Sequence, residues 1–206
     1  VAKSSPVATF QGNIMGTWTV LEACREIGDI ALIATSSNTV YGGKQEIMPT
    51  PEDLPLNPEG AYEVSKACAD MLARCYANTY GMKTAVIRPT NSYGGADWNT
   101  RHLVIDMTLS ILRNESPVLL GDGQSVKGFQ YAGDTAGGYL TLAENIHRPE
   151  VVGQAFNIVP DDAVSVKELV EKLVAVSENP NLSVVIKGTK RPPSEVDREF
   201  LSNQKA

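Results

Sequence analysis

The fold follows from one stretch of the chain, Ile30-Ala31-Leu32-Ile33-Ala34-Thr35, which continues directly into Ser36-Ser37-Asn38-Thr39-Val40-Tyr41-Gly42. A short apolar run without polar alternation is typical of a strand buried in a parallel sheet. Apolar residues at helical spacing predict a helix before it, over 6–27, and another after it, over 61–80. A second short strand is expected over 83–88. This order of helix, strand, helix and strand predicts a doubly wound α/β sheet.

Beyond Pro89 the pattern is less regular, and it predicts a smaller mixed α/β part. We expect Asp134 and Ser165 to be the N-caps of two helices that end near Ile146 and Val176. The other expected elements are a loop over 91–100, a helix over 101–113, and strands over 117–120, 155–159 and 182–186. No internal repeat interrupts this order.

Composition narrows the classes of function. The 206 residues are 42% hydrophobic and 20% charged, with a net charge of −6 and no basic stripe, which argues against a nucleic-acid partner. No apolar stretch approaches the ~20 residues of a bilayer span, and no signal segment opens the sequence. A cytoplasmic protein is expected from its unpaired cysteines instead. Three separated cysteines predict free thiols on helices, and two histidines without a Cys/His cluster predict no metal site.

A tyrosine and a lysine stand four residues apart, at Tyr62 and Lys66, on one face of a predicted helix. A nearby cation favours phenolate, so Lys66 is expected to lower the pKa of Tyr62. Such a phenolate can take a proton from a hydroxyl while hydride leaves the same carbon. Taken alone, the spacing also fits an ordinary surface pair. Ser36 and Ser37 add context, because they end a predicted parallel strand, where ligands bind in sheets of this type.

These residues resemble the catalytic set of the extended short-chain dehydrogenases, which combines serine or threonine with tyrosine and lysine. The likeness points to their NAD-dependent nucleotide-sugar epimerases and dehydratases. Further matching motifs follow in the family's order: Asn13-Ile14-Met15-Gly16-Thr17, Arg88-Pro89-Thr90-Asn91-Ser92-Tyr93-Gly94, Gly153-Gln154-Ala155-Phe156-Asn157-Ile158 and Lys205-Ala206.

The resemblance implies a role for each matching residue. Tyr62 would be the base, Ser37 would hydrogen-bond the reacting hydroxyl, and Lys66 would hold the nicotinamide ribose. The cofactor would be NAD, and the partner a nucleotide-diphosphate sugar. The implied cofactor contacts are Asn13, Ser36, Tyr62, Lys66 and Pro89, and the implied substrate contacts are Asn91, Lys127 and Arg191.

Two positions separate the subfamilies. Dehydratases of this family usually carry Asp and then Glu or Lys after the catalytic serine or threonine, whereas this chain has Asn38 and Thr39. An amide donates no acidic proton, and an ordinary hydroxyl is a poor base, which favours a 4-epimerase. Conversely, Gly94-Gly95-Ala96-Asp97-Trp98, with Arg101 soon after, resembles CDP-glucose 4,6-dehydratases. A non-catalytic module that binds NAD(H) or a nucleotide sugar is the third alternative.

Phosphate recognition departs from the family's Arg-Asp pattern, because Lys127 and Gly128 stand there. Lysine keeps the charge but loses the bidentate fork of arginine. Arg191, in a stretch that resembles the family's late Arg-Pro-Gly-Asp segment, would be a second phosphate contact. For both cations the alternative is solvated surface charge. Trp18 is expected in the core.

The resemblance also implies a domain plan. Residues 1–92, with 129–160 returning, would form part of the NAD-binding Rossmann domain, and 93–128 with 161–206 would form the substrate-binding lobe. No Gly-x-x-Gly-x-x-Gly turn occurs in the chain, so we expect the N-terminal half of the cofactor domain and the family's last helices to be missing. NAD binding by this chain alone is then expected to be weaker than about micromolar. A homodimer through the helices 13–27 and 61–80 is expected by analogy.

Overall fold

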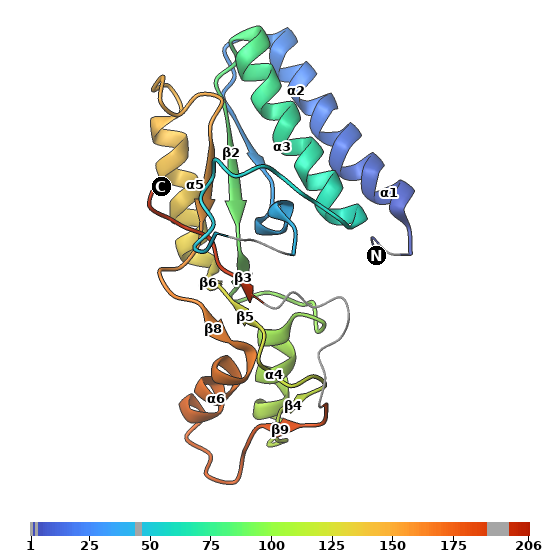
Figure 1. Cartoon of the computed structure of the whole chain (residues 1–206), viewed down its shortest axis with the longest axis vertical. Coiled ribbons are helices and arrows are strands. Elements are labelled where there is room, and N and C mark those ends of the chain that lie inside the picture. Colours follow the sequence, from blue (N-terminus) through green and yellow to red (C-terminus); the bar gives the residue numbers. More distant parts are fainter. Residues whose placement is uncertain (1, 3, 44–46, 189–197) are drawn as a thin grey trace.

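A computed structural model describes residues 2, 4–43, 47–188 and 198–206. Figure 1 shows an elongated molecule with two parts. In the upper part, long helices flank a sheet. The lower part holds shorter helices and strands, and further short strands join the two.

The upper part is built on a parallel sheet in the order β1 (Leu32–Thr35), β2 (Thr84–Pro89) and β7 (Ala155–Ile158). Helices cover both faces: α2 (Gly16–Ile27) and α3 (Ala61–Tyr80) lie on one side, and α5 (Ala132–Asn145) lies on the other (Figure 1). The predicted doubly wound α/β sheet is therefore confirmed.

The central strand β2 is apolar on both faces because both are covered. Ala85 and Ile87 pack toward α5 with Leu142, whereas Val86 packs toward α3 with Ala73. Successive side chains of a strand point to opposite faces, which explains why these neighbours enter different clusters. A strand that is buried on both faces needs apolar side chains at successive positions, which explains the unbroken apolar runs in the sequence.

The helices begin and end close to the predicted positions. The helix predicted over 6–27 comprises α1 (Pro6–Phe10), a π-helical segment η1 (Gln11–Met15) and α2. The α3 helix ends at Gly81, whose φ of +67° is the left-handed conformation that a helix C-terminus favours for glycine. Ser165 is the N-cap of α6 (Val166–Val176), with a full capping box to Glu168, as predicted.

The lower part contains short strand pairs and two helices. In it, α4 (Leu103–Leu112) packs with α6 around a core of Met107, Leu119, Val166 and Val170. The strands are β3 (Asn91–Tyr93) with β6 (Phe129–Tyr131), β4 (Val118–Leu119) with β9 (Val185–Ile186), and β5 (Val126–Lys127) between β8 (Val164–Ser165) and β10 (Arg198–Glu199).

Three local predictions were wrong. Asp134 caps no helix, because α5 already begins at Ala132 and Asp134 lies in its first turn. The expected loop over 91–100 begins with strand β3, which pairs with a distant segment that local sequence does not reveal. Trp18 is 47% exposed rather than in the core, and its indole Nε1 donates to the Tyr76 hydroxyl at 2.9 Å. A tryptophan with a polar partner at the surface keeps its N–H satisfied without full burial.

The last residues of the chain return to the upper part. Leu201 packs with Tyr41 and Ala67, and Lys205 Nζ donates to the carbonyl of Ala155 at 2.9 Å. Both residues fall in the range 161–206, which we had assigned to the substrate lobe. The division into a cofactor domain and a substrate lobe stays a prediction.

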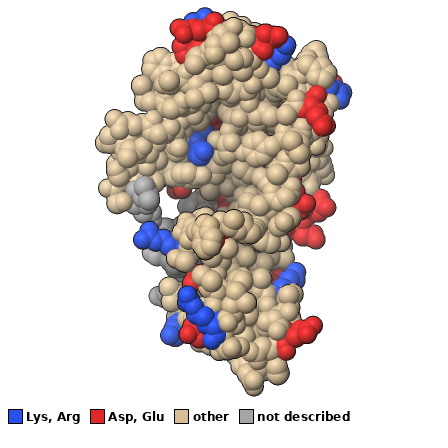
Figure 2. All heavy atoms as spheres, turned by 180° about the vertical axis from the view of Figure 1, so that it is seen from behind, with Lys and Arg blue, Asp and Glu red and all other residues tan. Residues whose placement is uncertain are grey.

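The described surface carries mixed charge. On the face in Figure 2, basic and acidic side chains are interspersed rather than gathered into one basic area. No helix within the described ranges combines the length and the apolar character needed to cross a membrane. In the same ranges, no three His, Cys, Asp or Glu side chains gather as a metal site would require.

Candidate active site

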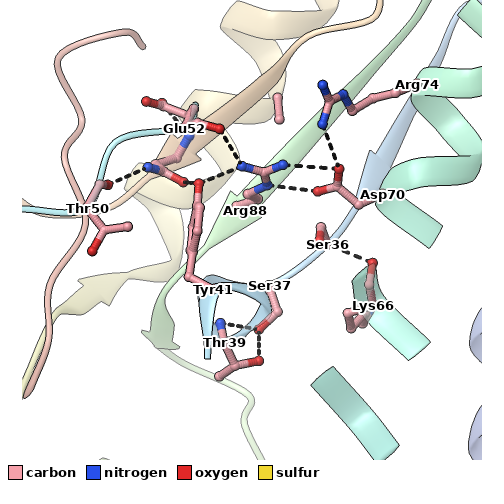
Figure 3. Close-up of polar contacts among 12 residues, drawn as sticks. Ser36, Ser37, Thr39, Tyr41, Thr50, Glu52, Lys66, Asp70, Arg74 and Arg88 are labelled. Atoms are coloured by element: carbon pink, nitrogen blue, oxygen red, sulfur yellow. Dashed lines mark hydrogen bonds and ion pairs between the residues drawn. The ribbon is translucent and has the colours of Figure 1, made fainter. Parts of the chain in front are cut away.

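Ser37 lies just past the carboxyl end of β1, where it caps the short 3-10 helix η2 (Asn38–Tyr41). Its side chain accepts from the Thr39 backbone N–H, and its Oγ lies 2.9 Å from Thr39 Oγ1 (Figure 3). These bonds fix a buried hydroxyl at the end of the sheet where ligands bind in parallel α/β folds.

Tyr62 lies in the first turn of α3 and keeps 40% of its surface exposed. Burial of the phenol raises the pKa of Tyr62, a hydrogen bond with Ser37 lowers it, and the Glu63 carboxylate raises it, with a net upward shift. The structure thus brings together Ser37 and Tyr62, which are 25 positions apart in the sequence.

Lys66 stands one turn further along α3, with its Nζ 6.0 Å from the centre of the Tyr62 ring. That ammonium donates to the backbone carbonyl of Thr35 at 3.1 Å, and burial lowers the pKa of Lys66. The expectation that Lys66 lowers the pKa of Tyr62 is wrong for the chain as described, because the ammonium is directed to β1 and Ser37 is the group that lowers this pKa.

The shift in Tyr62 can be tested on the chain itself. The difference in ultraviolet titration between the chain and its Tyr62→Phe variant should give a pKa above the ordinary ~10 of tyrosine. Ser37→Ala removes the hydrogen bond that favours phenolate and should raise this pKa further. A Tyr62 pKa below the ordinary value, or a decrease in Ser37→Ala, would contradict the arrangement described here.

The other predicted cofactor contacts, Asn13, Ser36 and Pro89, lie on segments near Tyr62 and Lys66. Asn13 Nδ2 donates to Ser65 Oγ at 2.8 Å, and Ser65 Oγ donates to the Tyr62 carbonyl at 2.7 Å. Asn13 therefore helps to fix the first turn of α3. Ser36 is buried and its hydroxyl donates to the Lys66 carbonyl at 3.3 Å, while Pro89 ends β2. Their contacts with a cofactor stay predictions.

The side chains of Asn38 and Thr39, the two positions that separate the subfamilies, form hydrogen bonds within the chain. Asn38 is buried, accepts from Ser37 Oγ at 3.2 Å and donates to Thr90 Oγ1 at 3.4 Å. Thr39 contacts Ser37. In the structure both side chains support Ser37, and neither brings a carboxyl group to the site.

Two of the predicted substrate contacts, Asn91 and Lys127, lie at the junction with the lower part. Asn91 lines a cavity of about 300 Å³ together with Asp97, Arg101 and His102. Here the Asp97 carboxylate pairs with His102 Nδ1 at 2.7 Å, and this hydrogen bond lowers the pKa of Asp97. Lys127 pairs in register with Glu199 on the neighbouring strand. Arg191 lies outside the described residues.

A buried polar network beside the site was missed by the sequence analysis. Arg88 donates to both carboxylate oxygens of Asp70, at 2.8 and 3.1 Å, and to the Tyr41 hydroxyl at 2.6 Å (Figure 3). Tyr41 in turn donates to Asn157 Oδ1 at 2.9 Å. The network joins η2, α3, β2 and β7. Its sequence signal was Asp70, a charged residue among the alanines on the buried face of α3.

The nicotinamide end of a dinucleotide fits the residues present. An ammonium has three N–H donors, and one from Lys66 goes to Thr35 among the described residues, so ribose hydroxyls can be bound by the others. The half-exposed Tyr62 phenol lies beside it. The diphosphate end has no Gly-rich turn in this sequence to bind it.

The doubly wound parallel sheet defines a Rossmann-type fold, and Ser37, Tyr62 and Lys66 lie near its carboxyl end. The chain belongs to the NAD dependent epimerase/dehydratase family, whose sequence model matches residues 1–158.

Similar proteins include both epimerases and dehydratases. CDP-glucose 4,6-dehydratase of Salmonella typhimurium is 26% identical over 184 residues, or 83% of this chain and 51% of that protein. A putative UDP-glucose 4-epimerase of Methanocaldococcus jannaschii is 33% identical over 135 residues, which cover 64% of this chain and 44% of that protein. The crystal structure of UDP-glucose 4-epimerase from Thermotoga maritima with UDP-glucose superposes with a TM-score of 0.88 at 26% identity, covering 100% of this chain and 65% of that one. The chain spans about half the length of these curated relatives.

Proposed function

We propose that a protein carrying this chain is an NAD-dependent nucleotide-sugar 4-epimerase, which oxidises C4 of a nucleotide-linked hexose transiently. The observation that supports this most is the grouping of Ser37, Tyr62 and Lys66 at the carboxyl end of β1. Family membership and the epimerase relatives support it as well.

Each of these residues has a distinct task. Tyr62 is the general base for the proton of the C4 hydroxyl, a role that falls to the ionised fraction of the phenol because the pKa of Tyr62 is raised. Ser37 donates a hydrogen bond to the C4 oxygen. Lys66 binds the nicotinamide ribose, and Asn13 holds the first turn of α3 in place. When bound, NAD supplies the hydride acceptor that C4 oxidation requires.

Asn38 and Thr39 favour epimerisation over dehydration. Elimination of water across C5 and C6 needs an acid and a base, and these two side chains provide neither. The alternative, a 4,6-dehydratase, is favoured by the Gly94–Trp98 loop and by the CDP-glucose 4,6-dehydratase relative. In that case, another group of the protein supplies the acid and the base.

The proposal also covers the substrate, the oligomeric state and the cellular location of the protein. A nucleotide-diphosphate sugar is the partner, with Asn91, Lys127 and Arg191 as its contacts. A homodimer through α2 and α3 is supported by exposed apolar side chains on these neighbouring helices, among them Trp18, Val20 and Met71. The three free cysteines fit a cytoplasmic location.

Product analysis tests the reaction type. The chain would be produced behind a strand, Gly-rich turn and helix able to hold the NAD diphosphate, and incubated with NAD and UDP-, CDP-, dTDP- and GDP-hexoses. We expect NMR to show a sugar inverted at C4 that keeps its C6 hydroxyl. A 4-keto-6-deoxy product would instead establish the dehydratase alternative, and the same reactions without NAD serve as the control.

A further inference from the structure

The short helix η2, which Ser37 caps, depends on the rest of the chain for its position. It has only four residues, Asn38–Tyr41, and the hydrogen bond from the Val40 N–H to the Ser37 carbonyl is long at 3.4 Å. Helices of the 3-10 type are usually short because their hydrogen bonds are poorly aligned. Contacts between η2 and the sheet therefore decide where Ser37 lies.

Tyr41 makes a short, buried contact of this kind. It is the last residue of η2, and its side chain is 1% exposed. Its hydroxyl accepts a hydrogen bond from Arg88 Nη1 at 2.6 Å and donates one to Asn157 Oδ1 at 2.9 Å (Figure 3). The bond from the guanidinium is charge-assisted, and such bonds are about twice as strong as neutral ones.

Both partners of the Tyr41 hydroxyl are themselves held in place. Arg88 lies on β2 and donates two hydrogen bonds to the Asp70 carboxylate. Asn157 lies on β7, and its Nδ2 donates to two backbone carbonyls at 3.2 and 3.1 Å. Arg88 and Asn157 are both fully buried. The Tyr41 hydroxyl thus ties η2 to two neighbouring strands of the central sheet.

Ser37 lies between this attachment and β1. Before Ser37, the Ser36 N–H donates to the Ile87 carbonyl at 2.8 Å, which fixes the end of β1 on the sheet. The side chains that contact the Ser37 hydroxyl, Asn38 and Thr39, belong to η2 themselves. They orient the hydroxyl within η2, whereas Tyr41 places the far end of η2 on the sheet.

We propose that Tyr41 is a positioning residue, whose hydroxyl holds η2 so that the Ser37 hydroxyl faces the reacting oxygen of the sugar. This inference rests on the proposed function. Tyr41 is too deeply buried to contact the sugar itself, so it acts through Ser37. Misplacing a catalytic group by about 1 Å can lower turnover about 10²-fold, and loss of one attachment of η2 should cause a smaller displacement.

Tyr41→Phe tests the inference, because it removes the hydroxyl and keeps the ring packed beside Ala67 and Leu201. On the NAD-competent protein, kcat should fall about tenfold while KM stays within about threefold, since Ser37 acts on the transition state. In a Ser37→Ala background, Tyr41→Phe should lower kcat no more than about twofold, because coupled residues are not additive. Asn157→Leu removes the acceptor but keeps Tyr41, and should lower kcat as well.

Tyr76→Phe is the matched control. Tyr76 is also buried, and its hydroxyl likewise has one donor and one acceptor as partners, Trp18 Nε1 at 2.9 Å and Glu22 Oε2 at 2.7 Å. It should lower the midpoint of chemical denaturation, as Tyr41→Phe does, and leave kcat unchanged. An equal fall in kcat for both variants would make Tyr41 a structural residue and overturn the inference. A tenfold effect of Tyr41→Phe that persists without Ser37 would overturn it too.

Titration of Tyr62 decides the inference separately from the proposed function. In the 206-residue chain, Tyr41→Phe should raise the pKa of Tyr62, as Ser37→Ala should, because a displaced Ser37 no longer favours phenolate. The difference between ultraviolet titrations of Tyr41→Phe with and without Tyr62→Phe gives this pKa, and an unchanged value would overturn the inference. Absence of turnover in the unaltered NAD-competent protein would contradict the proposed function instead, and the titration would still decide the role of Tyr41.

Discussion

Replacing Tyr62 with Phe should lower turnover by about 10² to 10⁴-fold, the usual contribution of a positioned general base. The substitution removes only the phenol oxygen, to which the proposed mechanism assigns the proton of the C4 hydroxyl. The half-exposed ring and the helix around it stay in place. The affinity for the nucleotide sugar should therefore stay within about threefold of the original value, because the lost interaction belongs to the transition state.

This variant also separates an enzyme from a binding module. A module that only senses NAD(H) or a nucleotide sugar needs no base, so Tyr62→Phe would leave its ligand affinity and its response intact. Steady-state rates and calorimetric affinities should be measured together on the NAD-competent protein described above. Tyr80→Phe removes an exposed phenol from the other end of the same helix, and it should leave the rate unchanged. An unaffected rate in Tyr62→Phe would remove Tyr62 from the mechanism.

Asp70→Asn should destabilise the chain by about 3–5 kcal/mol, because it leaves the Arg88 guanidinium buried without its counter-charge. Both side chains are fully buried, and Arg88 makes two hydrogen bonds to the carboxylate. Arg88→Met should cost a similar amount, because the buried Asp70 carboxylate then keeps only the long, half-exposed ion pair with Arg74. Chemical denaturation of the 206-residue chain measures the free energy of unfolding for each variant.

Two comparisons show whether the loss comes from the buried charge. Arg74 also pairs with Asp70, at 3.8 Å, but its side chain is 45% exposed, so Arg74→Met should cost no more than about 1 kcal/mol. The double variant Asp70→Leu/Arg88→Met removes both charges and should be less destabilised than the sum of its two single substitutions. Additive losses would mean that the pair contributes through packing rather than through charge.

The same network explains why part of the site was predictable and part was not. Ser37, Tyr62 and Lys66 could be proposed from the sequence because each stands in a local pattern: the end of an apolar strand, or one face of a helix. The sequence identified Arg88 only as the first residue of the Arg88–Gly94 motif and gave it no partner. Its partners Asp70 and Tyr41 are 18 and 47 positions away in the chain. Which charges face one another in the interior depends on how α3 and η2 pack on β2.

The direction of the pKa shift of Tyr62 also could not be predicted from the local sequence. The spacing of Tyr62 and Lys66 was read correctly as a shared helix face, yet the ammonium is bound to Thr35 on the neighbouring strand. Burial, Ser37 and Glu63 decide the pKa of Tyr62 instead. A pKa depends on the surroundings in three dimensions, and spacing along one helix describes only a fraction of them.

By itself the sequence determined the α/β order, the end of α3 at Gly81 and the capping of α6 by Ser165, and it supplied the residues of the proposed catalytic set. These features depend on local signals such as apolar periodicity, a glycine with positive φ and a capping box. Only the tertiary structure decided that Asp134 lies inside its helix, that Trp18 is half exposed and that Arg88 pairs with Asp70. Those outcomes depend on contacts between segments far apart in the chain, and burial and charge pairing act through distance in space rather than distance in sequence.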